Sequence, residues 1–141
     1  FRSGGLIADD YLTFVPTLSR RKFLGVLKRM DVYLDTPAFS GFTTAIQALA
    51  CGGLPVVTLN GEFLRNRLAA AILLRIDVTE TLATDMDEYV ALVARLVREP
   101  AWRDDLRHKI LDRLPRAYED QSVIRTLEDF LEECCRGSKS K

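Results

Sequence analysis

The sequence predicts an α/β protein in which helices flank a parallel sheet. Short apolar or β-branched runs alternate along the chain with segments of helical periodicity, an order typical of β-α-β units. One run, Pro55–Leu59, is apolar nearly throughout, as expected of a strand covered on both faces. The chain has 141 residues, of which 48% are hydrophobic and 28% are charged, and this composition fits one ordinary domain.

The predicted strands and the helices between them lie before residue 84. Aromatic and β-branched residues predict four strands, at Tyr11–Pro16, Asp31–Thr36, Pro55–Leu59 and Thr79–Ala83. Apolar residues spaced by three and four predict three helices, at 20–30, Thr43–Cys51 and Glu62–Ile76. Ser19 is the expected N-cap of the first helix, and Gly52 and Gly53 are expected to end the second.

The pattern after residue 84 is helical only. Thr84 and Asp87 form a capping-box signal at the start of the next helix. Two further helices are predicted at Trp102–Leu114 and Ser122–Cys135, and each has an apolar stripe that needs a surface to pack on. We expect the polar residues 136–141 to form a disordered tail.

Charge and cysteine content exclude several classes of protein. Twenty basic and twenty acidic side chains give zero formal net charge, so no electrostatic footprint for nucleic acid or an anionic membrane surface is present. The longest uncharged run, residues 36–61, is broken by two prolines and is not a continuous membrane span. Three cysteines, two of them adjacent, argue against a disulfide framework. We therefore expect a cytoplasmic protein with neither nucleic acid nor membrane as a partner.

The start of the helix at Thr43 is the best candidate for a ligand site. Ligands of an open parallel sheet bind beyond the carboxyl ends of its strands, where the next helix directs its free N–H groups. Gly41 would let the backbone approach a phosphate, and Thr43 and Thr44 would offer hydroxyls and amide donors to a diphosphate. The same string also describes a plain N-cap with a tight turn, which is its commoner meaning.

Three neighbouring side chains could serve the same site. Gln47 lies one turn beyond Thr43, where it could reach the sugar hydroxyls of a nucleotide or simply be solvated. Arg20 and Arg21 open the first helix and either face the same crevice or form a charged helix face.

Other polar residues are weaker candidates. Glu62, Arg65 and Arg67 open the helix after the third strand, and they could either contact an anionic ligand or pair at the surface. His108 falls away from the apolar stripe of its helix and is expected at the surface. Cys51 is expected to fill a small volume in the core. The pattern of these residues predicts no metal site.

Two common α/β families do not fit the sequence. A dinucleotide-binding glycine motif is missing between the first strand and its helix. Asp35 superficially resembles the phosphoacceptor of a receiver domain, but no acidic pair follows the first strand and no lysine lies between Lys28 and Lys109.

The order of motifs within Asp31–Leu74 resembles the catalytic region of the O-linked N-acetylglucosamine transferase and SPINDLY family, in particular its bacterial members. The motifs are a strand ending in Leu34-Asp35-Thr36, a Gly41-Phe42-Thr43-Thr44 helix start, an Ala-Leu-x-x-Gly helix end, Pro55–Leu59, and a Gly-Glu pair before an arginine-rich helix. The resemblance extends over residues 11–135.

That resemblance implies a glycosyltransferase B fold, in which two Rossmann-like halves face each other across a cleft. Residues 1–135 would be most of the C-terminal, nucleotide-sugar-binding half of a larger enzyme, ending in helices, and the N-terminal half would be missing. The implied enzyme transfers a sugar from UDP-N-acetylglucosamine, or from a GDP-sugar in the SPINDLY branch, to serine or threonine of a protein acceptor. The resemblance implies no metal and no cofactor other than this donor.

The resemblance also implies roles for individual residues. The donor diphosphate would lie against Gly41, Phe42, Thr43 and Thr44, and the ribose and base would lie against Gln47, Leu18, Arg20 and Phe23. It identifies no catalytic base.

Three of these positions differ from the animal enzymes. Phe42 and Phe23 each replace a histidine, and Gln47 replaces the carboxylate that usually meets the ribose. The alternative is therefore a non-catalytic interaction or scaffold module that descends from the same family.

Overall fold

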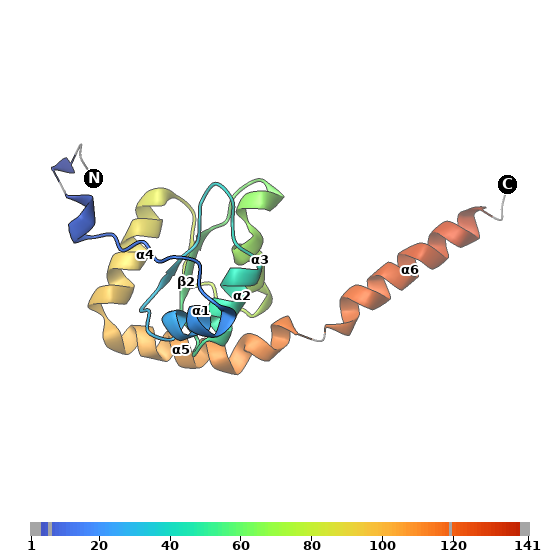
Figure 1. The fold of residues 1–141 in the computed structure, drawn as a ribbon. Helices are drawn as coiled ribbons and strands as arrows, with labels where there is room; N and C mark the ends of the chain where they lie inside the picture. The colour runs from blue at the N-terminus through green and yellow to red at the C-terminus, as the bar shows by residue number, and fades with distance from the viewer. Residues whose placement is uncertain (1–3, 6, 119, 139–141) are drawn as a thin grey trace.

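Three parallel strands in the order β1-β2-β3 form the sheet in the computed structural model, which describes residues 4–5, 7–118 and 120–138 (Figure 1). The strands are β1 (Tyr33–Leu34), β2 (Val56–Leu59) and β3 (Leu82–Ala83). In the register, Tyr33 lies opposite Val56 and Thr58 lies opposite Leu82. The predicted α/β class and three of the four predicted strands are therefore confirmed.

Helices cover both faces of the sheet. Figure 1 shows the strands between α4 on one side and α2 and α3 on the other, with α5 running across one end. The helices are α1 (Arg20–Leu27), α2 (Thr43–Ala50), α3 (Leu68–Arg75), α4 (Met86–Arg98), α5 (Pro100–Arg113) and α6 (Gln121–Ser138). Short 3₁₀ helices occupy Ala8–Asp10, Leu64–Asn66 and Leu114–Ala117.

The core lies where α2, α3 and α4 meet β2. Ala45 and Ala48 of α2 are fully buried, and their small side chains let that helix lie close to the sheet. The largest buried apolar side chains are Leu49, Leu54, Val56, Val57, Leu73, Ile76, Val78, Leu96 and Ile110.

Two glycines fix the end of α2. Gly52 and Gly53 have φ of +77° and +66°, a region that side-chain-bearing residues rarely adopt. A Cβ at Gly53 would overlap the backbone carbonyl of Arg107 on α5. The Arg107 guanidinium in turn donates to the carbonyl oxygens of Gly52 at 3.3 Å and Met30 at 2.6 Å. These contacts tie α5 to the ends of α1 and α2.

The predicted strand at Tyr11–Pro16 is wrong. Its backbone forms no strand, and the side chains of Tyr11, Phe14 and Val15 are 64%, 89% and 55% exposed. A strand needs a neighbour for its backbone N–H and C=O groups, and none of the described strands pairs with this run. The run does contain apolar and β-branched residues, but such a pattern does not show whether a partner strand is present.

Two helix starts differ from the prediction. The expected helix at Glu62–Ile76 is divided, because the side-chain oxygen of Asn66 accepts the Phe63 N–H at 3.0 Å and the chain turns before α3 begins. The N-cap of α4 lies one residue later than expected. Asp85 is the N-cap, and Glu88 takes the place predicted for Asp87, although its carboxylate accepts from Thr84 and not from the Asp85 N–H.

The final helix is present but projects away from the body of the molecule (Figure 1). The side chains of its apolar stripe, Val123, Ile124, Leu127, Phe130 and Leu131, are each more than half exposed. The prediction of an amphipathic helix is confirmed, whereas the described residues provide no surface for its stripe. α6 continues through Ser138 into the predicted tail, and residues 139–141 lie outside the described residues. No helix of the described ranges combines the length and apolar character needed to cross a membrane.

Candidate functional site

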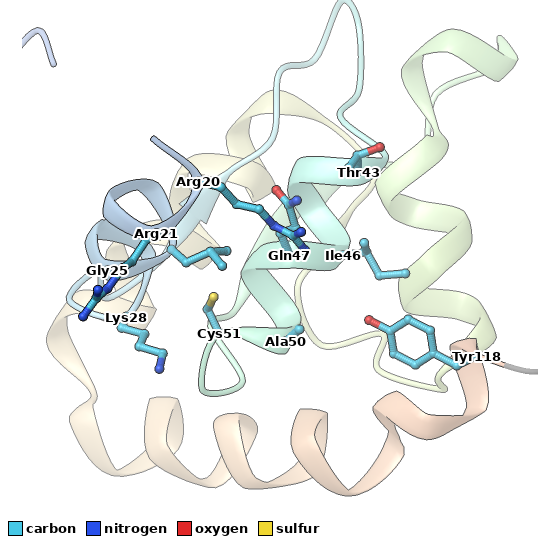
Figure 2. A pocket seen from close by; sticks show the side chains of 11 residues that line it. Arg20, Arg21, Gly25, Lys28, Thr43, Ile46, Gln47, Ala50, Cys51 and Tyr118 are labelled. Atoms are coloured by element: carbon cyan, nitrogen blue, oxygen red, sulfur yellow. The ribbon is translucent and has the colours of Figure 1, made fainter. Parts of the chain in front are cut away.

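A groove of about 980 Å³ runs between α1 and α2 and reaches the segment after the last 3₁₀ helix (Figure 2). It brings together four of the residues predicted for a ligand site, which are Arg20, Arg21, Thr43 and Gln47. The complete lining is Arg20, Arg21, Leu24, Gly25, Lys28, Thr43, Ile46, Gln47, Ala50, Cys51 and Tyr118. Three segments that are separate in the sequence, residues 20–28, residues 43–51 and Tyr118, therefore build one concave surface.

The polar side of the groove is positively charged. Arg20, Arg21 and Lys28 come from α1, and Figure 2 shows Arg20 reaching towards Gln47 on α2. No aspartate or glutamate of the described residues is part of the lining. Three cations beside apolar walls favour an anionic ligand that also carries an apolar or aromatic group.

The start of α2 lies at the end of this groove and has no cap. Phe42 precedes the helix with helical backbone angles, φ −96° and ψ −66°, and no side chain accepts a hydrogen bond from the first turn. No acidic residue lies in that turn. The amides of Thr43 and Thr44 and the exposed Thr43 hydroxyl are thus donors at the positive end of the helix dipole.

Gly41 and Thr44 lie on the inner side of this helix start. The Tyr33 hydroxyl donates to Thr44 Oγ1 at 2.9 Å, which holds the Thr44 side chain towards β1. A Cβ at Gly41 would lie 2.5 Å from Thr44 Oγ1, so a larger residue here would displace the Thr44 side chain.

Asp35 holds the loop before α2, a role that we did not predict from the sequence. The residue is only 3% exposed and lies directly after β1. Its Oδ2 accepts hydrogen bonds from the hydroxyls of Ser40 and Thr58, and its Oδ1 accepts one from the Gly41 N–H, each at 2.7 Å. Signals available in the sequence were the acidic residue at the end of a buried strand and a serine just before the next helix.

Further hydrogen bonds surround the Asp35 network. Ser40 Oγ accepts the Ala69 N–H at 2.8 Å, at the start of α3, and the Ser40 N–H donates to the carbonyl of Arg65 at 2.8 Å. The Tyr89 hydroxyl of α4 donates to the Asp35 carbonyl at 2.9 Å. Burial, with a smaller effect of the Asp35 charge, raises the pKa of Tyr89 to about 12, so this tyrosine remains a donor at neutral pH.

The other residues predicted for the donor do not line the groove. Phe42 is 53% exposed and borders a separate depression of about 160 Å³ with Ile46 and Arg75. Phe23 is half-buried and packs against the core, and Leu18 is half-buried outside the lining. Their contacts with a ribose or base stay predictions.

Of the weaker candidates, Cys51 lines the groove and the others lie apart from it. Glu62, Arg65 and Arg67 are exposed, and the Arg65 guanidinium lies 4.8 Å from the ring centre of Phe63. His108 is at the surface, as predicted. Cys51 is buried as predicted, and it also lines the groove. Within the described ranges, no three His, Cys, Asp or Glu side chains gather as metal ligands would.

Comparison with known proteins identifies related sequences and a related structure. Residues 7–120 match glycosyl transferase family 41. The chain is 36% identical over 80 residues to a UDP-N-acetylglucosamine–peptide N-acetylglucosaminyltransferase of Caenorhabditis elegans, a match that covers 57% of this chain and 7% of the relative. A probable UDP-N-acetylglucosamine–peptide N-acetylglucosaminyltransferase SPINDLY of Hordeum vulgare is 28% identical over 101 residues, covering 70% of this chain and 11% of that protein.

A solved structure is also similar. It is a mutant of the Thermobaculum terrenum O-GlcNAc transferase, with a TM-score of 0.81 and 28% sequence identity. The match covers 94% of this chain and 25% of that one. The chain therefore corresponds to a quarter of the solved chain and to about a tenth or less of these two curated relatives.

Proposed function

The chain belongs to glycosyltransferase family 41, and from this premise we propose that it is the donor-binding part of a protein O-glycosyltransferase. The observation that carries the proposal is the groove that joins Arg20 and Gln47 to Thr43 at an uncapped helix start. The donor is a UDP-N-acetylglucosamine-like nucleotide sugar, or a GDP-sugar as the second choice. The acceptor is a serine or threonine hydroxyl of a protein.

In the proposed complex, the diphosphate lies at the start of α2. The amides of Thr43 and Thr44 and the Thr43 hydroxyl donate to its oxygens, and the guanidinium of Arg20 balances its charge. Gln47, one turn further along the groove, donates to or accepts from the ribose hydroxyls. The apolar walls exclude water around these contacts and strengthen them.

Transfer breaks the bond between the anomeric carbon and the diphosphate oxygen and forms a bond from that carbon to the acceptor oxygen. The negative charge that develops on the leaving diphosphate is stabilised by the helix start and by the groove cations. The proton of the acceptor hydroxyl goes to a general base. We assign that base to the N-terminal half of the enzyme, together with the acceptor site, so this chain alone binds donor without turnover.

The protein is proposed to act in the cytoplasm and without a bound metal. The first expectation rests on three free cysteines, of which Cys134 and Cys135 are exposed. The second rests on the groove cations, which perform the charge neutralisation that a divalent ion would otherwise supply.

The second candidate is a non-catalytic interaction module. It is favoured by the exposed Phe42, which by the family resemblance stands where the animal enzymes have a histidine, and by the uncovered apolar stripe of α6. A module of this kind would keep the fold without keeping nucleotide affinity.

Calorimetric titration with UDP, GDP and NAD tests the proposal. Saturable binding of UDP or of GDP, without binding of NAD, is the expected result and identifies the base of the donor. Titration in the presence of EDTA should leave the affinity unchanged. Absence of binding to both UDP and GDP would favour the interaction module.

A further inference from the structure

We propose that Asp35 is a positioning residue for the donor site, because its buried carboxylate fixes the Ser40–Gly41 loop and thereby the start of α2. This inference rests on the proposed function, since it assumes that the start of α2 receives the donor diphosphate. Asp35 itself does not touch the donor in this account. It acts through the loop that connects β1 to α2.

The burial of Asp35 is the first observation. A carboxylate that is 3% exposed carries a large desolvation cost, and burial normally requires a cation or several donors as compensation. No Lys, Arg or His of the described residues forms a salt bridge with Asp35. Its partners are instead two hydroxyls and one amide, all at 2.7 Å. The side chain is therefore held for the hydrogen bonds that it accepts.

The location of the three donors is the second observation. Two of the three donors, Ser40 and Gly41, belong to the loop immediately before α2, and the third, Thr58, belongs to the neighbouring strand. By accepting the Gly41 N–H, Asp35 satisfies a loop amide that lies two residues before the first residue of α2. The amides of Thr43 and Thr44 are left for a ligand.

The link to α3 is the third observation. The Ser40 hydroxyl donates to Asp35 and accepts the Ala69 N–H, so one side chain joins the carboxylate to the start of a second helix. Asp35 is itself fixed in the sheet, because its N–H donates to the Val57 carbonyl at 3.0 Å and its carbonyl accepts from Tyr89. The start of α2 is thus preorganised by the sheet, and this arrangement removes an ordering cost from donor binding.

Two matched variants separate positioning from mere stability. Ser40→Ala and Thr58→Val each remove one 2.7 Å hydrogen bond to the same oxygen, Asp35 Oδ2, one from the loop side and one from the sheet side. Ser40→Ala also removes the acceptor of the Ala69 N–H, so its loss of Tm should be the larger of the two. Both variants should lower the Tm of the 141-residue chain. The UDP dissociation constant from calorimetry should rise about fivefold for Ser40→Ala and change less than about twofold for Thr58→Val. Equal affinities, or equal losses, in the two variants would overturn the positioning role.

Hydrogen exchange of the Gly41 amide, which donates to Asp35, keeps the two proposals distinguishable when it is measured on the same variants without nucleotide. We expect exchange at this amide to be about tenfold faster in Ser40→Ala and nearly unchanged in Thr58→Val. If the parent chain binds neither UDP nor GDP, the proposed function fails, and this exchange pattern alone still supports Asp35 as the residue that fixes the helix start. The same exchange rate at the Gly41 amide in the parent chain and in both variants would refute that role, whether or not the nucleotide binds.

Discussion

The starts of α2 and α4 differ in how their first backbone amides are paired: α4 has a side-chain cap and α2 has none. Every helix begins with amides that lack a partner within the helix. At α4, Asp85 accepts the Glu88 N–H at 2.8 Å, and Glu88 accepts from the backbone and hydroxyl of Thr84 at 2.7 Å. At α2, no side chain caps the first turn and no carboxylate lies in it.

α1 and α5 also begin without a side-chain cap, so the contrast with α4 matters at α2 because free amides there adjoin a positively charged groove. The start of α4 is satisfied by its own sequence and needs no ligand. The start of α2 is uncapped and opens on a groove that carries three cations. Its support comes from the inner side, through Asp35, Ser40 and Gly41, rather than from a cap on the outer side.

Removal of the Asp35 carboxylate should have the largest effect on stability. Asp35→Ala leaves the hydroxyls of Ser40 and Thr58 and the Gly41 N–H without their acceptor in the core. We expect a loss of about 4 kcal/mol in the free energy of unfolding, measured by urea denaturation. A loss below about 1 kcal/mol would show that the α2 start is held by other contacts.

The next effect concerns affinity rather than stability. Thr43→Val removes the exposed hydroxyl at the α2 start and keeps the shape of the side chain. The UDP dissociation constant should rise about tenfold, because a hydrogen bond to a charged phosphate is lost. The Tm should not change, since valine and threonine have similar helix propensities.

Thr84→Val is the matched control at the other helix start. It removes the hydroxyl that donates to Glu88 and should leave UDP affinity at the parent value. If both threonine variants weakened UDP binding equally, the contrast between the two helix starts would be false.

Removal of the Asp85 cap at the start of α4 should have a smaller effect on stability. Asp85→Ala deprives the Glu88 N–H of its acceptor and should lower the free energy of unfolding by about 1 kcal/mol. The value can be measured by urea denaturation, with calorimetry on the same sample showing unchanged UDP affinity. A loss of UDP affinity without loss of stability would mean that α4, and not α2, lies at the donor.

The smallest effect should appear as a pH dependence. Hydrogen bonds from the backbone and side chain of Thr84 lower the pKa of Glu88 from its ordinary value of 4.5. The folded state therefore binds this proton less readily than the unfolded chain. The stabilisation is complete above pH 4.5 and is lost as the pH falls through the lowered pKa.

Glu88→Gln should remove this dependence. The parent chain and the variant should differ in Tm near pH 7 and converge towards about pH 3. A Tm difference that stayed constant over this range would show that the hydrogen bonds of the Glu88 carboxylate do not depend on its charge.

The sequence predicted these regions unequally for physical reasons. Local patterns were sufficient for β2 and for the range of α2, because a continuous apolar run and the helical spacing of apolar residues are properties of neighbouring positions. They placed the α4 cap one residue away, since Thr84 and Asp85 are both good N-cap residues. They failed at Tyr11–Pro16, where strand formation depends on a partner strand that the run itself does not specify.

The candidate site could be predicted only in part for the same reason. Thr43 and Gln47 were found because they lie in the first turns of the helix that follows β1, and Arg20 was found because it opens the helix before β1. The role of Asp35 was missed because its carboxylate acts through contacts with Ser40, Gly41 and Thr58, which lie 5, 6 and 23 residues away. Such a network is determined by the packed sheet and has no periodic signature.

A titration of the ¹⁵N-labelled chain with UDP, followed by amide chemical shifts, tests the contrast between the two helix starts most directly. The account predicts large, saturable shifts at the amides of Thr43 and Thr44 and at residues that line the groove, with little change at Met86, Asp87 and Glu88. Shifts at the α4 start, or saturable binding that leaves the α2 start unchanged, would contradict it.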